Sequence, residues 1–250
     1  MEDTPVQNTM DLLEMVLEIE RFSPHHNMLS ATRLLQIGNY LELEEGQSVM
    51  DCGCGRGEAL CLWAKYFGTQ GIGVDVHAPS LSDAAALAQR ENLSDKVQFV
   101  HANMQEYETN GTGFDVVACL GATFIFGGFE PAIRGMRDMI VPGGQIVIGE
   151  AIYTADNVPA ELRDYEGDCP TEMKLFNAAR ATGCEVGYYS RASRDEWERY
   201  IFNRYRIRKE FLSMPYGPER DKASPRRWQD MYLRYRQNWQ SMAFMVIHPA

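Results

Sequence analysis

The chain has 250 residues and a net charge of −11, with 45% hydrophobic and 24% charged residues. This composition is typical of a folded globular protein and excludes wholesale disorder, and the length allows one large domain, or a domain with a cap. The negative charge argues against non-specific binding to nucleic acid or anionic membranes. The longest apolar run, 116–126, is too short to span a bilayer, and the acidic start does not resemble a signal peptide. We therefore expect a soluble, cytoplasmic protein with no membrane partner.

Apolar side chains at helical spacing predict two helices before the first strand, at Met10–Ile19 and Ser30–Leu41, and Ser30 can cap the second. Short apolar runs then alternate with helical stretches. The expected strands are 48–52, 71–76, 97–101, 114–120, 145–149, 184–189 and 242–247. The expected helices between them are 58–67, 81–91, 131–140 and 171–181, with a turn at 142–144.

The order of these elements predicts the fold. Strands that alternate with helices and are apolar throughout indicate a parallel sheet covered on both faces. Residues 191–237 differ, because they hold 13 Lys and Arg against 7 Asp and Glu and are predicted to be helical. We expect an α/β fold in one domain, 1–250, with a doubly wound, seven-stranded, mainly parallel sheet. Its parts are N-terminal helices (1–44), a ligand-binding core (45–190), a helical cap (191–238) and a final strand (239–250).

The loop after the first strand, Asp51-Cys52-Gly53-Cys54-Gly55-Arg56-Gly57-Glu58, is the most informative stretch. Its glycines let the backbone pass close to a ligand, and ligands of open parallel sheets bind beyond the carboxyl ends of the strands. A dinucleotide fingerprint would need glycine at position 58, where Glu58 would repel a pyrophosphate. Asp51 suits a cationic ligand end. The loop therefore favours S-adenosylmethionine, which carries an ammonium and a sulfonium but no phosphate.

A second acidic residue, Asp75, ends the next strand, 18 residues after Gly57. A carboxylate at this position can accept hydrogen bonds from both ribose hydroxyls. The feature is common to NAD sites and S-adenosylmethionine sites, so it indicates a ribose without choosing between them.

With these residues the sequence resembles the class I S-adenosylmethionine-dependent methyltransferases. The resemblance rests on segments within residues 45–150, namely 49–58, 71–75, 100–104, 114–122 and 142–148. A narrower resemblance is to a bacterial group of small-molecule methyltransferases, most of which lack an assigned substrate. It rests on 26–30, 121–123, 149–150, Asp195, Trp197 and Tyr200. Together these imply a Rossmann-like methyltransferase fold, S-adenosyl-L-methionine as cofactor and S-adenosyl-L-homocysteine as product.

The resemblance also implies a set of cofactor-binding residues. The three loop glycines would line the methionine portion with Asp51 near its ammonium, Asp75 would hold the ribose, and the segment after the fourth strand would border the sulfonium. The adenine would meet Asn103, which stands where Asp is usual, and Met104. The full expected set is Asp51, Gly53, Cys54, Gly55, Gly57, Asp75, Val76, Asn103, Met104, Leu120, Gly121 and Ala122.

The methyl acceptor is less well defined. Methyl transfer needs an in-line approach of the nucleophile and needs a general base only when the acceptor is protonated, so no catalytic residue can be assigned. His26, Glu150 and Tyr153 are the candidates, with capping or structural roles as the alternative. The sequence at 120–123 lacks the Asp/Asn-Pro-Pro-aromatic motif of base methylation, and no Pro-Cys nucleophile is present. A small-molecule acceptor is therefore expected, and nucleic acid is not.

Arginines and aromatic residues are interleaved in segment 191–237. The pattern fits a lid over the substrate, a nucleic-acid surface, or amphipathic helices packed on the core. Three other functions stay open: an NAD-dependent oxidoreductase, a module that binds the cofactor without turnover, and an RNA methyltransferase that uses this segment. No metal site is expected, and the oligomeric state is open, with a homodimer among the options. The substrate-binding candidates are Thr123, Glu150, Tyr153, Asp195, Trp197, Tyr200 and Arg204.

Overall fold

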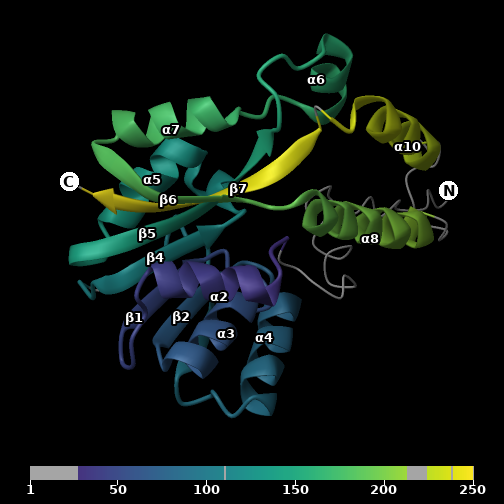
Figure 1. Ribbon diagram of the computed structural model, residues 1–250. Helices are drawn as coiled ribbons and strands as arrows, with labels where there is room; N and C mark the ends of the chain where they lie inside the picture. The colour runs from purple at the N-terminus through teal and green to yellow at the C-terminus, as the bar shows by residue number, and fades with distance from the viewer. Residues whose placement is uncertain (1–27, 110, 213–223, 238, 250) are drawn as a thin grey trace, which may run out of the picture.

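The computed structural model describes residues 28–109, 111–212, 224–237 and 239–249. Their strands form a seven-stranded sheet in the order β3-β2-β1-β4-β5-β7-β6 (Figure 1). The first five strands in this order run parallel, and β7 is antiparallel to both of its neighbours. The expected α/β fold with a mainly parallel sheet is confirmed. The strands are β1 (Ser48–Cys52), β2 (Gln70–Asp75), β3 (Val97–His101), β4 (Phe114–Leu120), β5 (Ile140–Tyr153), β6 (Cys184–Arg191) and β7 (Gln240–Pro249).

Helices cover both faces of the sheet (Figure 1). On one face lie α2 (Ala31–Tyr40), α3 (Glu58–Phe67) and α4 (Ala78–Arg90), and on the other lie α5 (Phe129–Arg137) and α7 (Glu172–Ala181). Each face has its own buried apolar cluster, the first including Trp63 of α3 and the second including Ile133 of α5. Ser30 caps α2 as expected, through a bond from the N–H of Arg33 to its hydroxyl. The helix expected at 10–19 lies outside the described residues.

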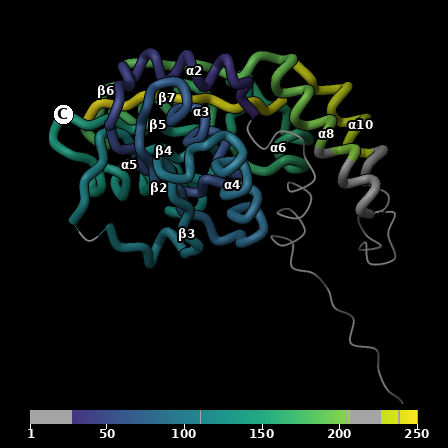
Figure 2. The backbone as a smooth tube through the Cα atoms, turned by 90° about the horizontal axis from the view of Figure 1, so that it is seen from below, coloured from purple at the N-terminus to yellow at the C-terminus, as the bar shows by residue number. Residues whose placement is uncertain are grey.

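Two helices of the basic segment, α8 (Arg194–Leu212) and α10 (Ser224–Tyr235), lie between β6 and β7 in the chain. Figures 1 and 2 show them side by side at one end of the molecule. The Trp228 ring stacks on Tyr205 and on Tyr232, with centroid distances of 5.3 and 5.4 Å. These aromatic side chains therefore pack against one another, as expected for amphipathic helices that share a core.

Several element boundaries differ from the expected ones. Strand β5 runs through the expected turn at 142–144, because Ile140 pairs with Phe114 and Gln145 with Val116, which leaves a bulge between two paired segments. Helix α4 begins at Ala78 rather than at 81, with a proline in its first turn. The short helix α6 (Ala160–Glu166) was not expected, since seven residues are too few to give a clear periodicity.

The register of the central strands sets the position of the site. Asp51, near the end of β1, lies beside Gly73 of β2 and Ala118 of β4. Because β1, β2 and β4 are parallel neighbours, their carboxyl ends and the loops that follow meet at one edge of the sheet.

Candidate functional site

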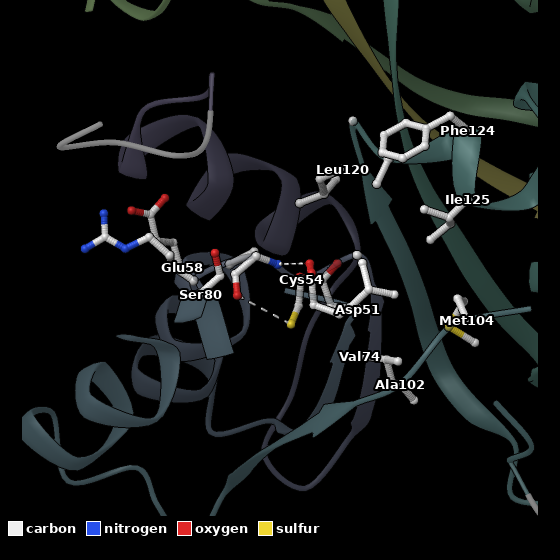
Figure 3. A pocket seen from close by; sticks show the side chains of 18 of the residues that line it. Asp51, Cys54, Glu58, Val74, Ser80, Ala102, Met104, Leu120, Phe124 and Ile125 are labelled. Atoms are coloured by element: carbon white, nitrogen blue, oxygen red, sulfur yellow. Dashed lines mark hydrogen bonds between the residues drawn. The ribbon is translucent and has the colours of Figure 1, made fainter. Parts of the chain in front are cut away.

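A cavity of about 190 Å³ lies beyond the carboxyl ends of β1, β2 and β4. Figure 3 shows Asp51 and Cys54 of the glycine loop in its middle, with Phe124, Ile125 and Met104 together on one side. Eleven of the twelve expected cofactor-binding residues line it: Asp51, Gly53, Cys54, Gly55, Asp75, Val76, Asn103, Met104, Leu120, Gly121 and Ala122.

The glycine loop is held against the neighbouring strand by main-chain bonds. The N–H groups of Gly53 and Cys54 both donate to the carbonyl oxygen of Val74, at 2.8 and 3.1 Å. Gly53 has φ of +75°, and a Cβ there would lie 2.6 Å from the Cβ of Ala122. A side chain at this position would therefore both strain the backbone and collide with the loop after β4.

Gly57 is the exception among the twelve, because it does not line the cavity. It is the N-cap of α3, with φ of +69°. A Cβ there would lie 2.5 Å from the Phe99 ring and 3.1 Å from Ala84. In this structure Gly57 allows the turn into α3 and its close packing on β3 and α4, while its neighbours Arg56 and Glu58 line the cavity.

Asp51 is a buried carboxylate on the wall of the cavity, with only 3% of its surface exposed. Its Oδ1 atom has no hydrogen-bond partner among the described residues. Burial, and secondarily the negative charge of Asp75, raise the pKa of Asp51 to about 7. A cationic group bound beside it would offset the cost of burying this charge, whereas a phosphate would add to it.

Asn103 and Met104 follow β3 and line the cavity beside the segment after β4. The Oδ1 atom of Asn103 accepts a bond of 3.1 Å from the N–H of Gln105, which fixes the local turn and leaves its amide N–H₂ to other partners. Met104 is buried. Sequence reasoning missed Met28, Ser80, Phe124 and Ile125 of this cavity. Phe124 and Ile125 continue the apolar run beyond β4, which was the available signal.

Of the substrate-binding residues expected in the cap, some line the cavity in the structure and others do not. Tyr200 of α8 lines the cavity. Trp197 is buried but does not line it, and its Nε1 has no partner among the described residues. Asp195 is exposed in the first turn of α8, where it acts as a helix-terminal charge. His26 and the side chain of Arg204 lie outside the described part of the chain.

Glu150 and Thr123 form a hydrogen-bonded pair. The Thr123 hydroxyl donates to Oε2 of Glu150, and the N–H of Ala151 donates to Oε1 at 2.9 Å. Burial raises the pKa of Glu150, while these two bonds lower it by less. Neither residue lines the cavity, although Thr123 sits between two residues that do, Ala122 and Phe124.

Tyr153 does not belong to this site. Its hydroxyl donates to the carbonyl oxygen of Gly167 at 2.5 Å, and its ring lines a different cavity together with Cys169. Burial, with smaller contributions from neighbouring acidic groups, raises the pKa of Tyr153 to about 12. The suggestion that Tyr153 acts as base or substrate ligand in this cavity is therefore corrected.

Comparisons with known proteins agree with this geometry. A family described as a methyltransferase domain matches residues 49–144. The Escherichia coli (strain K12) protein YjhP is 31% identical over 180 residues, which are 70% of this chain and 72% of YjhP. Erythromycin 3''-O-methyltransferase from Saccharopolyspora erythraea is 27% identical over 149 residues, 59% of this chain but only 47% of that protein.

A solved structure extends the likeness to the whole chain. It is an S-adenosylmethionine-dependent methyltransferase from Geobacter sulfurreducens in complex with S-adenosyl-L-homocysteine, with 25% identity, a TM-score of 0.82 and full coverage of both chains. The chain belongs to the class I S-adenosylmethionine-dependent methyltransferases, and S-adenosylmethionine is its cofactor. Within the described residues, no helix has both the length and the apolar character needed to cross a bilayer.

Proposed function

We propose that the cavity beyond β1, β2 and β4 holds S-adenosylmethionine and that the methyl acceptor is a small molecule. The observation that carries the first part is the buried carboxylate of Asp51, with one oxygen unpartnered among the described residues, on the wall of a cavity walled by glycines. A buried carboxylate in a cavity lined by glycines fits a ligand with a positively charged amino-acid end.

The proposed roles follow the positions of the residues along the cavity. Gly53 and Gly55 lie against the methionine portion and Asp51 near its ammonium. Asp75 accepts from the ribose hydroxyls, and Asn103 and Met104 meet the adenine. Leu120, Gly121 and Ala122 border the sulfonium, and Met28 and Tyr200 line the same cavity.

When bound, the cofactor would supply an electrophilic methyl group, which the acceptor's nucleophile attacks in line while S-adenosylhomocysteine leaves. The protein's contribution is to fix the geometry and exclude water, which can supply most of the rate enhancement. Glu150, a partly buried carboxylate that accepts a hydrogen bond from the Thr123 hydroxyl, is proposed as a base that acts through Thr123. It would serve an acceptor that is protonated near neutral pH.

Three observations support a small acceptor. The cavity is lined in part by Met28, Leu120 and Tyr200, which offer apolar and aromatic surface to an acceptor. The net charge of −11 disfavours a nucleic-acid substrate. The erythromycin methyltransferase, by its name, acts on a small molecule.

The experiment incubates the protein with S-adenosylmethionine labelled on its methyl group and with a bacterial metabolite extract, and then identifies the labelled product. A labelled small molecule is expected, and it should be lost in an Asp75→Ala control. Label found only in RNA or protein would contradict the proposed acceptor class. Absence of saturable S-adenosylhomocysteine binding by calorimetry would contradict the proposed cofactor cavity.

A further inference from the structure

Glu196, in the first turn of α8, lies outside the cavity and is only 7% exposed. Its carboxylate accepts five hydrogen bonds of 2.7–3.2 Å. Two come from the N–H and hydroxyl of Ser30, two from the N–H and hydroxyl of Ser193, and one from Nη2 of Arg33. The carboxylate is therefore fully satisfied at a buried position.

These partners make Glu196 a shared cap for two helices. Ser193 precedes α8, and its hydroxyl accepts a bond from the N–H of Glu196, which completes a capping box. Ser30 is the N-cap of α2. The same carboxylate thus joins the N-termini of two helices that are more than 160 residues apart in sequence.

The negative charge of the Glu196 carboxylate is compensated by Arg33. Arg33 pairs with Glu196 at 3.2 Å and also donates to the Ser190 hydroxyl at 2.9 Å. Burial raises the pKa of Glu196, but the bonds from Ser193 and Ser30 outweigh it and hold the pKa at about 2. The carboxylate is therefore ionised at neutral pH.

A residue near the N-terminus of each of these two helices lines the cavity. Met28 precedes Ser30 by two residues and Tyr200 follows Glu196 by one helical turn, and both line the cavity. The Cε atom of Met28 lies 3.7 Å from the point where a Cβ on Gly121 would be. Met28 therefore approaches the end of β4, at which the sulfonium is proposed to lie.

We propose that Glu196 is a positioning residue for the acceptor end of the cavity, because its carboxylate fixes Met28 and Tyr200 relative to one another. This inference rests on the proposed function. According to this proposal, the Arg33–Glu196 ion pair lies outside the cavity and holds the segments that carry Met28 and Tyr200 in fixed positions beside the bound cofactor.

A purely local cap would stabilise each helix by itself, so the first test asks whether the two helix ends are coupled. Backbone hydrogen exchange is measured by mass spectrometry on peptides covering 29–34 and 193–197. Ser30→Ala, on α2, is expected to accelerate exchange at 193–197, and Glu196→Gln to accelerate exchange in both peptides. Glu91→Gln, which removes an exposed ion pair with Lys65, is the matched control and should change neither.

The second test uses S-adenosylhomocysteine as the probe and calorimetry as the readout. Glu196→Gln is expected to weaken binding by about fivefold, and in a Tyr200→Ala background the same change should have less than half of that effect, because coupled residues are non-additive. A merely structural role would lower Tm and leave the affinity of the folded protein unchanged. If Glu196→Gln does not fold, Ser30→Ala takes its place in the same cycle.

The outcomes separate the two proposals. Absence of S-adenosylhomocysteine binding by the unmodified protein would reject the proposed function. The exchange experiment would still show whether Glu196 couples the N-termini of α2 and α8. Normal binding together with unchanged exchange at 193–197 in Ser30→Ala would contradict the coupling of the two helix N-termini through Glu196. Fully additive effects of Glu196→Gln and Tyr200→Ala would overturn the positioning role.

Discussion

The N–H of Gly55 donates a 2.8 Å hydrogen bond to Oδ2 of Asp75, which joins the glycine loop after β1 to the end of β2. The other carboxylate oxygen, Oδ1, accepts from the N–H of His77 at 2.8 Å. Asp75 therefore shapes the loop that surrounds the cavity as well as lining the cavity itself. Each oxygen keeps a further lone pair for a ribose hydroxyl.

Replacement of Asp75 by Ala should weaken S-adenosylhomocysteine binding by about ten- to a hundredfold, since charge-assisted hydrogen bonds contribute about 1.5–3 kcal/mol each. Loss of the Gly55 bond should also lower Tm, because the loop loses its anchor. Calorimetry and thermal unfolding on the same preparation measure both effects. Unchanged affinity would remove Asp75 from the binding site.

The protein with Asp51 should have a lower free energy of unfolding at high pH than a variant with Asn, the neutral isostere, at this position. Its pKa of about 7 in the folded protein lies above the value near 4 of an unfolded chain, so its contribution to stability is lost as pH rises from about 4 to 7. At pH 8, Asp51→Asn is expected to raise the free energy of unfolding by about 1–3 kcal/mol. At pH 5 the difference should shrink, because the native carboxyl is then protonated. A gain that is equal at both pH values would contradict this charge-based explanation.

The same carboxyl makes cofactor binding depend on pH. A ligand ammonium binds the ionised form, so affinity for S-adenosylhomocysteine should change by less than about twofold between pH 7 and 8 and should fall below pH 7, by up to about tenfold per pH unit. The thiols of Cys52, Cys54 and Cys119 stay neutral in this range, because burial raises the pKa of each. Calorimetry from pH 5.5 to 8 measures the effect. Asp51→Asn should bind more weakly and show a flat profile, and an equally steep profile in this variant would assign the dependence to another group.

The sequence predicted the parts of the site that depend on local chemistry. Glycines with positive φ, apolar strands and an acidic residue at a strand end are fixed by short segments, and Asp51, Gly53, Gly55 and Asp75 do meet at the cavity. Met28 and Ser80 could not be found in this way, because their presence there depends on how helices α2 and α4 pack on the sheet.

Strand geometry explains why Glu150 and Tyr153 were grouped together and are in fact separated. Both follow the apolar centre of β5, but side chains three residues apart on a strand point to opposite faces. Tyr153 packs in the cluster with Trp63, while Ile152 packs in the other cluster with Ile133. The sequence gives the end of the strand but not which face borders the cavity.

Gly57 offers a test of whether the third loop glycine serves packing or ligand binding. Gly57→Ala should lower the free energy of unfolding by about 2–4 kcal/mol, since it combines a left-handed φ of +69° with a Cβ 2.5 Å from the Phe99 ring. Gly46→Ala is the matched control, because Gly46 has φ of +86° but no atom within 4 Å of its Cβ position, so it should lose only about 1 kcal/mol.

Chemical denaturation measures both variants, and calorimetry then measures S-adenosylhomocysteine binding under conditions in which each is folded. Because Gly57 does not line the cavity, the affinity of folded Gly57→Ala should stay within about threefold of the unmodified protein. A large loss of affinity with little loss of stability would instead return Gly57 to the ligand-binding wall. Equal destabilisation of the two variants would show that the Phe99 ring moves aside and that only the backbone conformation requires glycine.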